Sequence, residues 1–108
     1  MSDEKEDLRK RTKRFALRVI KVYESLPRSG SAQVLAYQLL RSGTSVGANF
    51  REAHRARSDA EFLSKVGDSL QELEETTYWL ELQQQLFLAD YSRFHPSSFI
   101  FHLFHACN

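Results

Sequence analysis

Apolar residues recur along most of this chain at alternating intervals of four and three positions. The pattern runs from Leu8 to Leu26 and again from Phe62 to Phe87, and residues 38–53 repeat it in between. Residues at these intervals stack along one face of an α-helix, whereas a half-buried strand would need an interval of two. The sequence therefore predicts an all-α chain with long helices over about residues 3–26, 31–57 and 59–88.

Local signals mark where the predicted helices begin and end. Pro27 cannot continue the first helix, and a short polar turn follows it. Either Ser29 or Ser31 can cap the second helix. Ser58 followed by Glu61 forms a capping box at the start of the third. Because connections this short favour antiparallel neighbours, they predict an up-down bundle.

The middle helix carries residues that helices usually avoid. Gly43 and Gly47 each cost about 1 kcal/mol relative to alanine, so we expect them to allow a neighbouring helix to approach closely, with Gly67 doing the same on the third helix. A polar stripe runs beside these glycines, and we expect it to hydrogen-bond between helices. This inter-helix polar seam comprises Ser42, Ser45, Asn49 and Glu52, with Ser69 and Glu72 opposite. The alternative is that much of the stripe faces water.

The third predicted helix is apolar around much of its circumference. Leu63, Leu70 and Thr77 widen its main apolar row on one side, and Trp79 adds apolar surface nearby. A helix of this kind needs more than one neighbour. Part of this surface is therefore interpreted as an interface between copies of the chain. The alternative is a broad core stripe inside one bundle.

Charge is distributed unevenly, although the formal net charge is only +1. Residues 1–58 contain 13 Lys and Arg against 6 Asp and Glu, whereas residues 59–108 contain 2 against 8. This asymmetry allows a basic surface, or attraction between oppositely charged parts of two copies. The residues expected to contact RNA or DNA phosphates are Arg11, Arg14, Arg18, Lys21, Arg51, Arg55 and Arg57. The alternative is a solvated row on the first helix and dipole-complementing charges at the end of the second.

The end of the chain, residues 90–108, breaks the helical pattern. Pro96 interrupts any helix, and the stretch from Phe99 to Ala106 is almost wholly apolar. The pattern predicts a short or irregular fourth helix, and its composition is that of a truncated or frame-shifted end. Four side chains here belong to metal-binding types: His95, His102, His105 and Cys107. Their spacing is not that of a zinc site, so we predict no metal and no cofactor.

Composition places the chain among single-domain proteins that stay in the cytoplasm. A length of 108 residues suffices for one core, which makes residues 1–108 one domain. The single cysteine excludes an internal disulfide and fits a reducing compartment. The first residues are densely charged rather than signal-like, and no apolar run approaches the roughly 20 residues of a membrane span. We therefore expect a cytoplasmic protein with no membrane partner.

The sequence contains no arrangement of residues typical of an enzyme. Residues 43–49, GTSVGAN, superficially resemble a phosphate-binding loop but lack its Lys-Ser/Thr ending. Ser42 and Ser45 have no nucleophile elbow and no evident base. The carboxylates of the third helix are better explained as surface charge than as an acid–base pair. We predict no catalytic residue, no small-molecule substrate and no enzymatic activity.

Two motifs resemble those of a known family. The pattern RS-x-x-SV-x-x-N-x-x-E spans residues 41–52, and Ser69-Leu70 with Glu72-Leu73 follows it. Together they resemble the small four-helix-bundle proteins encoded in intervening sequences of bacterial 23S ribosomal RNA genes, over roughly residues 8–90. The accessory proteins of diversity-generating retroelements, which bind nucleic acid and a reverse transcriptase, are a related branch. The resemblance implies a ring-like homo-oligomer, commonly a pentamer, but the intervening-sequence branch has no established biochemical function.

These observations together predict an all-α, up-down four-helix bundle with a short or irregular fourth helix, assembled as a homo-oligomer. Its expected function is that of a non-enzymatic interaction protein that binds RNA or DNA through the basic residues. The alternative is a structural or protein-binding scaffold in which those charges only keep the surface soluble. The nucleic-acid-binding and scaffold functions make different predictions about the basic residues of the first helix and those ending the second. Binding of RNA or DNA predicts that they converge on one face, whereas scattered charges would favour the scaffold.

Overall fold

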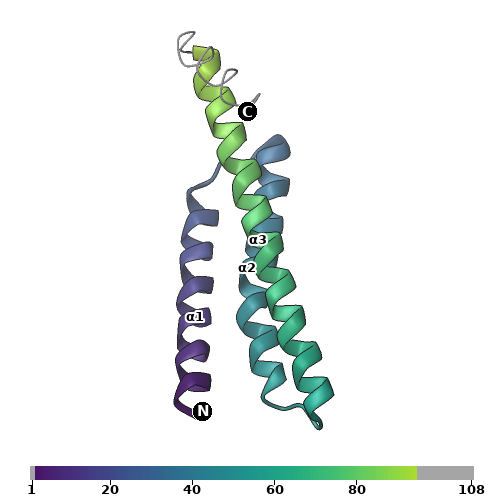
Figure 1. Cartoon of the computed structure of the whole chain (residues 1–108). Helices are drawn as coiled ribbons and strands as arrows, with labels where there is room; N and C mark the ends of the chain where they lie inside the picture. The colour runs from purple at the N-terminus through teal and green to yellow at the C-terminus, as the bar shows by residue number, and fades with distance from the viewer. Residues whose placement is uncertain (1, 95–108) are drawn as a thin grey trace.

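The computed structural model describes the backbone of residues 2–94 and the side chains of residues 3–87. It contains three helices, α1 (Ser2–Ser25), α2 (Gly30–Ala53) and α3 (Asp59–Phe94). They run up, down and up again, so successive helices are antiparallel (Figure 1). The described residues contain no strand, which confirms the all-α prediction. The predicted fourth helix falls in the part of the chain that the structure does not describe.

The central element is α2, which packs against both other helices. Its Cα atoms come within 8 Å of α1 and of α3, whereas α1 and α3 do not approach each other to that distance. The buried apolar residues are Val19 on α1 and a row along α2: Ala36, Leu39, Val46, Phe50 and Ala53. The four-and-three spacing of this row keeps it on one side of α2, where it forms most of the described core.

The helices α1 and α2 approach each other closely at two glycines. A Cβ atom added to Gly43 would lie only 2.7 Å from Val19 Cγ1, and one added to Gly47 would lie 3.1 Å from Thr12 Oγ1. Both distances are shorter than ordinary contacts, which confirms the close approach predicted at these positions. The prediction is wrong for Gly67 within the described chain, because nothing lies within 4 Å of its added Cβ.

The helix ends differ from the predicted ones in ways that the caps explain. The backbone N–H of His54 donates to the Arg51 carbonyl at 3.2 Å and that of Arg55 to the Glu52 carbonyl at 3.0 Å, so α2 ends at Ala53 rather than near residue 57. Five residues then connect to α3, where Ser58 Oγ accepts a hydrogen bond of 3.1 Å from the Glu61 N–H, as expected of a capping box. At its other end α3 continues to Phe94 instead of ending near residue 88.

Large apolar side chains remain on the surface of all three helices. Leu17 on α1, Val34 on α2, and Leu63 and Leu70 on α3 are each more than half exposed. Apolar surface of this extent is typical of proteins that bind a partner. None of the described helices combines the length and the apolar character needed to cross a membrane.

Candidate functional site

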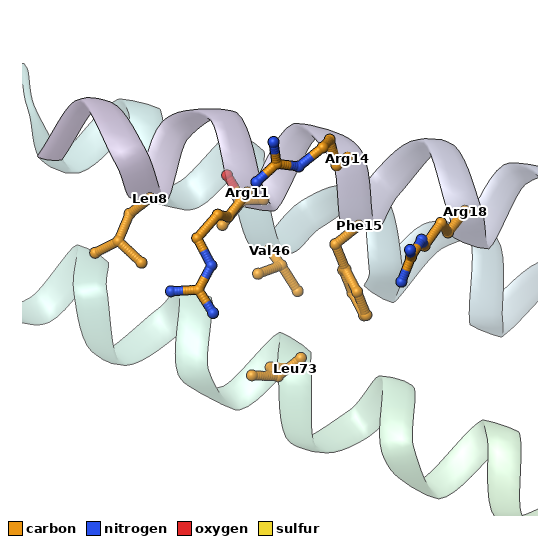
Figure 2. Close-up of a pocket in the computed structure, with 8 residues that line it drawn as sticks. Leu8, Arg11, Arg14, Phe15, Arg18, Val46 and Leu73 are labelled. Atoms are coloured by element: carbon orange, nitrogen blue, oxygen red, sulfur yellow. The ribbon is translucent and has the colours of Figure 1, made fainter. Parts of the chain in front are cut away.

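A groove lies between α1 and α3, with α2 as its floor. Its volume is about 600 Å³. It is lined by Leu8, Arg11, Thr12, Arg14, Phe15 and Arg18 from α1, Val46 from α2 and Leu73 from α3. The side chains of Leu8, Arg11 and Phe15 reach from α1 towards α3 (Figure 2). The groove is thus apolar at its centre and basic along its α1 wall.

The basic row predicted on α1 is exposed along its length. Arg11, Arg14, Arg18 and Lys21 all face solvent. Only Arg11 has a carboxylate within 4 Å among the described residues, and its 3.8 Å contact with Asp7 joins two exposed side chains of the same helix. Such exposed pairs contribute little to stability. The positive charge of this row is therefore available to a partner.

The basic residues at the end of α2 lie around separate hollows. Arg51 and Arg55 share a cavity of about 420 Å³ with Arg9, Glu52 and His54. Arg57 lines another, also of about 420 Å³, together with Lys5 and the start of α3. Arg9 and Arg11 belong to different cavities because residues two positions apart point about 200° apart around a helix.

The seven predicted nucleic-acid-binding residues therefore do not line one common cavity. Three lie in the groove, two share the hollow with Arg9, and Arg57 lies beside the α2–α3 connection. Lys21 lines none of these cavities. Any binding surface that uses all seven would have to wrap around α1 or be assembled from more than one copy.

Two members of the predicted polar seam lie buried between α2 and α3. The Ser69 hydroxyl donates a hydrogen bond of 2.7 Å to the Val46 carbonyl on α2. The Ser42 and Thr76 hydroxyl oxygens lie 2.8 Å apart, and Thr76 Oγ1 is also 2.8 Å from the Glu72 carbonyl. Because each hydroxyl has one proton, Thr76 can donate to Ser42 while Ser42 donates to the Leu39 carbonyl, 3.3 Å away. These contacts fix the register of α2 against α3 without leaving a buried hydroxyl unpaired.

The other seam residues lie at its margins. Ser45 donates a hydrogen bond of 2.7 Å to the Arg41 carbonyl within α2, and Asn49 is half-buried. Glu52 is exposed and accepts a hydrogen bond of 2.8 Å from Lys65 Nζ. This hydrogen bond and the charge of Glu52 raise the pKa of Lys65 above its usual value of 10.5. The Glu52–Lys65 contact is therefore a surface ion pair.

Arg41 is the polar residue that most extensively joins α2 to α3. Its Nη1 lies 3.4 Å from a Glu72 carboxylate oxygen, and its Nη2 lies 3.4 Å from Glu75 Oε1. Its Nε donates a hydrogen bond of 3.2 Å to Gln38 on its own helix. The sequence pattern did not predict that Arg41 would pair with these two acids. The available signal was that Glu72 and Glu75 are three positions apart and so share a face of α3.

Aromatic and cationic side chains meet at the end of the bundle where α1 begins. The His54 ring packs edge-on against Phe50, with centroids 4.7 Å apart, and lies 6.4 Å from Phe62. Lys5 Nζ lies 5.4 Å above the Phe62 ring, within the range of a cation–π contact. The buried Nε2 of His54 has no hydrogen-bond partner among the described residues, and the same is true of the indole nitrogen of Trp79 near the middle of α3.

No described residues form a recognisable metal centre. Among the described side chains of residues 3–87, no three of His, Cys, Asp or Glu are grouped to hold an ion. The four residues of metal-binding type near the end of the chain lie outside the described residues: His95, His102, His105 and Cys107. The features that the described residues do form are grooves and charged surfaces.

The described chain forms three long antiparallel helices, and α2 lies between the other two. The protein therefore belongs to the class of helical bundles. The sequence matches the family described as 23S rRNA-intervening sequence protein over residues 4–97. The chain therefore belongs to the 23S rRNA-intervening sequence protein family. This membership confirms the resemblance drawn from the motifs of α2 and α3.

A solved structure from Bacteroides thetaiotaomicron VPI-5482 is similar to this chain. It is described as a protein with unknown function from the S23 ribosomal protein family. The two are 44% identical, the match covers 68% of each chain, and the TM-score is 0.64. None of the curated proteins matches the chain. The comparisons thus establish family and fold, and the family's function is unknown.

Proposed function

We propose that this chain is a non-enzymatic, self-assembling helical-bundle protein of the cytoplasm that binds RNA or DNA through its exposed arginines. The observation that carries the nucleic-acid part is the uncommitted positive charge on α1 and at the end of α2. All seven residues are exposed, and only Arg11 has a carboxylate within 4 Å among the described side chains. Exposed guanidinium groups of this kind neutralise phosphates and release counterions, which favours binding.

Self-assembly is supported by the apolar surface that the described helices leave uncovered. Leu63, Leu70 and Phe87 on α3 are between 57% and 70% exposed, a costly arrangement for an isolated monomer. An assembly of several copies, expected to number five from the family resemblance, would cover them. It would also bring the separate basic hollows of several copies onto one surface.

A scaffold without a nucleic-acid role is the second candidate. It is favoured by the division of the seven basic residues among separate cavities. In a scaffold the arginines would serve solubility or contacts with protein. The two functions differ in one measurable property. When a protein binds phosphates, the logarithm of its affinity for the nucleic acid falls steeply and linearly with the logarithm of the salt concentration.

The test is binding to a structured ribosomal RNA fragment across a salt series. The wild type is compared with two triple variants, R14Q/R18Q/K21Q on α1 and R51Q/R55Q/R57Q around the end of α2. We expect tight binding at low salt that falls with a steep slope. Loss of three phosphate contacts should reduce that slope by about 2 to 3 in whichever variant removes the interface.

The control is K13Q, which removes one exposed positive charge about 80° or more around α1 from each residue of the α1 variant. It should leave most of the slope in place. Mass measurement of every variant separates loss of RNA contacts from loss of assembly. Absence of salt-dependent binding by the wild type would refute the nucleic-acid role and favour the scaffold.

A further inference from the structure

A basic hollow lies at the end of the bundle where α1 begins and α2 ends. It is the cavity of about 420 Å³ that is lined by Arg9, Arg51, Glu52, His54 and Arg55. Arg9 belongs to the first half of α1, and the other four belong to the end of α2 and the connection after it (Figure 1). Three arginines face one glutamate here, so positive charge is in excess while His54 is neutral. A hollow of this kind attracts anions.

The acids beside the basic hollow do not neutralise its arginines. Glu52 accepts a hydrogen bond of 2.8 Å from Lys65, a base that does not line the hollow. Glu6 lies 3.7 Å from Arg9, but both side chains are about half exposed, and an exposed pair of this kind contributes little to stability. The two other arginines have no carboxylate within 4 Å among the described side chains. An anionic ligand can therefore bind all three guanidinium groups without breaking a strong contact.

The dipole of α2 accounts for only part of this positive charge. The C-terminal end of a helix carries about half a negative elementary charge, so a basic residue there is stabilising without any ligand. Arg51 and Arg55 together exceed that half charge, and Arg9 belongs to another helix. The carbonyls of Arg51 and Glu52 also accept hydrogen bonds from the N–H groups of His54 and Arg55 already. The remaining positive charge is thus available to a ligand.

The charge of the basic hollow matches a terminal phosphate group better than a phosphate inside a strand. A phosphate inside an RNA or DNA strand is a diester with one negative charge. A terminal phosphate is a monoester that carries about −1.5 to −2 at pH 7 and offers three acceptor oxygens. Arginines bind such oxygens with two parallel N–H donors each, and here they come from two separate helices that line one cavity. The hollow can therefore hold a single dianionic group from more than one side.

We propose that the basic hollow binds the phosphorylated end of an RNA or DNA strand. Arg51 and Arg55 donate hydrogen bonds to the terminal phosphate oxygens, and Arg9 exchanges Glu6 for the same phosphate. This inference rests on the proposed nucleic-acid binding and assigns the end of the strand, rather than its body, to one site. It also adds Arg9, which the sequence pattern did not indicate, to the residues that bind phosphate.

The test compares RNA oligonucleotides of one sequence that carry a 5′-phosphate, a 3′-phosphate or no terminal phosphate. Each has an internal fluorophore, and fluorescence anisotropy measures its affinity for the full chain. At least one phosphorylated strand should bind the wild type about tenfold or more tightly than the strand without a terminal phosphate. R51Q/R55Q should bind all three strands alike, and R9Q should reduce the preference. Circular dichroism confirms that each variant is folded.

Each variant has a control of equal charge. K10Q matches R9Q, because Lys10 is the exposed base next to Arg9 and does not line the basic hollow. R14Q/R18Q matches the double variant, because it removes two exposed arginines that line the groove instead. Both controls should keep the preference for the phosphorylated strand, even where the total affinity falls. An equal loss of preference in R14Q/R18Q and R51Q/R55Q would overturn the proposal, because it would mean that the whole surface attracts the extra charge.

Competition separates the possible sources of a phosphate monoester. Inorganic phosphate and a nucleoside monophosphate should displace the phosphorylated strand only at concentrations at least about tenfold above that of an unlabelled phosphorylated strand, because they lack its other phosphates. Displacement by inorganic phosphate at equal concentration would assign the basic hollow to a small anion and overturn the strand end.

Three results would separate this proposal from the function on which it rests. RNA binding with no preference for a phosphorylated end would overturn the assignment of the basic hollow and leave the proposed nucleic-acid binding intact. A wild type that shows no salt-dependent RNA binding would overturn both. Binding of a phosphoserine peptide that R51Q/R55Q abolishes, without any preference among the RNA ends, would assign the basic hollow to a phosphorylated protein instead.

Discussion

Gly43 sets the distance between α1 and α2. The side chain nearest to it, Val19, is the buried apolar residue of α1 and is branched at Cβ, so it cannot swing aside as a long flexible chain would. The helix tolerates the glycine because the approach it allows brings Val19 into the core. The absence of a methyl group at Gly43 therefore determines how closely α1 packs against α2.

Gly43→Ala tests this directly. The added methyl group would lie 2.7 Å from Val19 Cγ1. Overpacking of this kind costs about 1–3 kcal/mol, and the better helix propensity of alanine returns about 1 kcal/mol. We expect a net loss of up to about 2 kcal/mol in the free energy of unfolding, measured by urea denaturation.

Gly67→Ala is the matched control, because nothing lies within 4 Å of its added Cβ. It should raise stability by up to about 1 kcal/mol through helix propensity alone. Equal effects of the two substitutions would show that the close approach at Gly43 does not limit packing.

At the scale of helices, α2 uses different chemistry on its two sides. Close contacts at Gly43 and Gly47 join it to α1, whereas hydroxyl hydrogen bonds and the ion pairs of Arg41 join it to α3. Directional hydrogen bonds fix a register more strictly than apolar contact does. The α2–α3 hairpin is therefore the part of the fold with the most specific alignment.

Arg41→Met removes the cation that α2 presents to two acids of α3. The side chain of Glu72 is only 19% exposed, so its carboxylate would lose a partner in a partly desolvated place. We expect a loss of about 1–2 kcal/mol in the free energy of unfolding, measured by denaturation followed by circular dichroism. Lys65→Met, which breaks the more exposed pair with Glu52, should have no measurable effect. Equal losses would contradict a special role for Arg41.

Sequence pattern predicts the helices of this fold better than the contacts between them. The four-and-three spacing locates three helices, and the glycines indicate close packing before any neighbour is known. The spacing does not say which helix faces which stripe, so the partner of Gly43 on α1 and the hydroxyl pair with Thr76 came only from the structure. Arg41 was missed because its acidic partners lie more than thirty positions away.

For the whole molecule, the main consequence is that α1 packs on one side only among the residues that the structure describes. It packs on α2, contributes Val19 to the buried apolar residues, and borders the groove on its other side. Local opening is least costly where few contacts must be broken. A monomer of this protein should therefore release α1 before it separates α2 from α3.

Hydrogen exchange read by mass spectrometry measures this order. Amides in the middle of α1 should exchange faster than those of α2 around Ser42 and Val46. If the proposed self-assembly covers α1, protection of α1 should also rise with protein concentration, because association stabilises only the closed state. Equal protection of all three helices at low concentration would contradict the weak attachment of α1.

The indole nitrogen of Trp79, shielded and without a described partner, gives the molecule an internal optical probe. It is the only tryptophan in the chain, and it lies on α3, which α1 does not approach. Its emission therefore reports when α3 loses its neighbours, whereas far-ultraviolet ellipticity counts helix from all three elements. Unfolding curves recorded with the two signals need not coincide, and the gap between them measures the population in which α1 alone has detached.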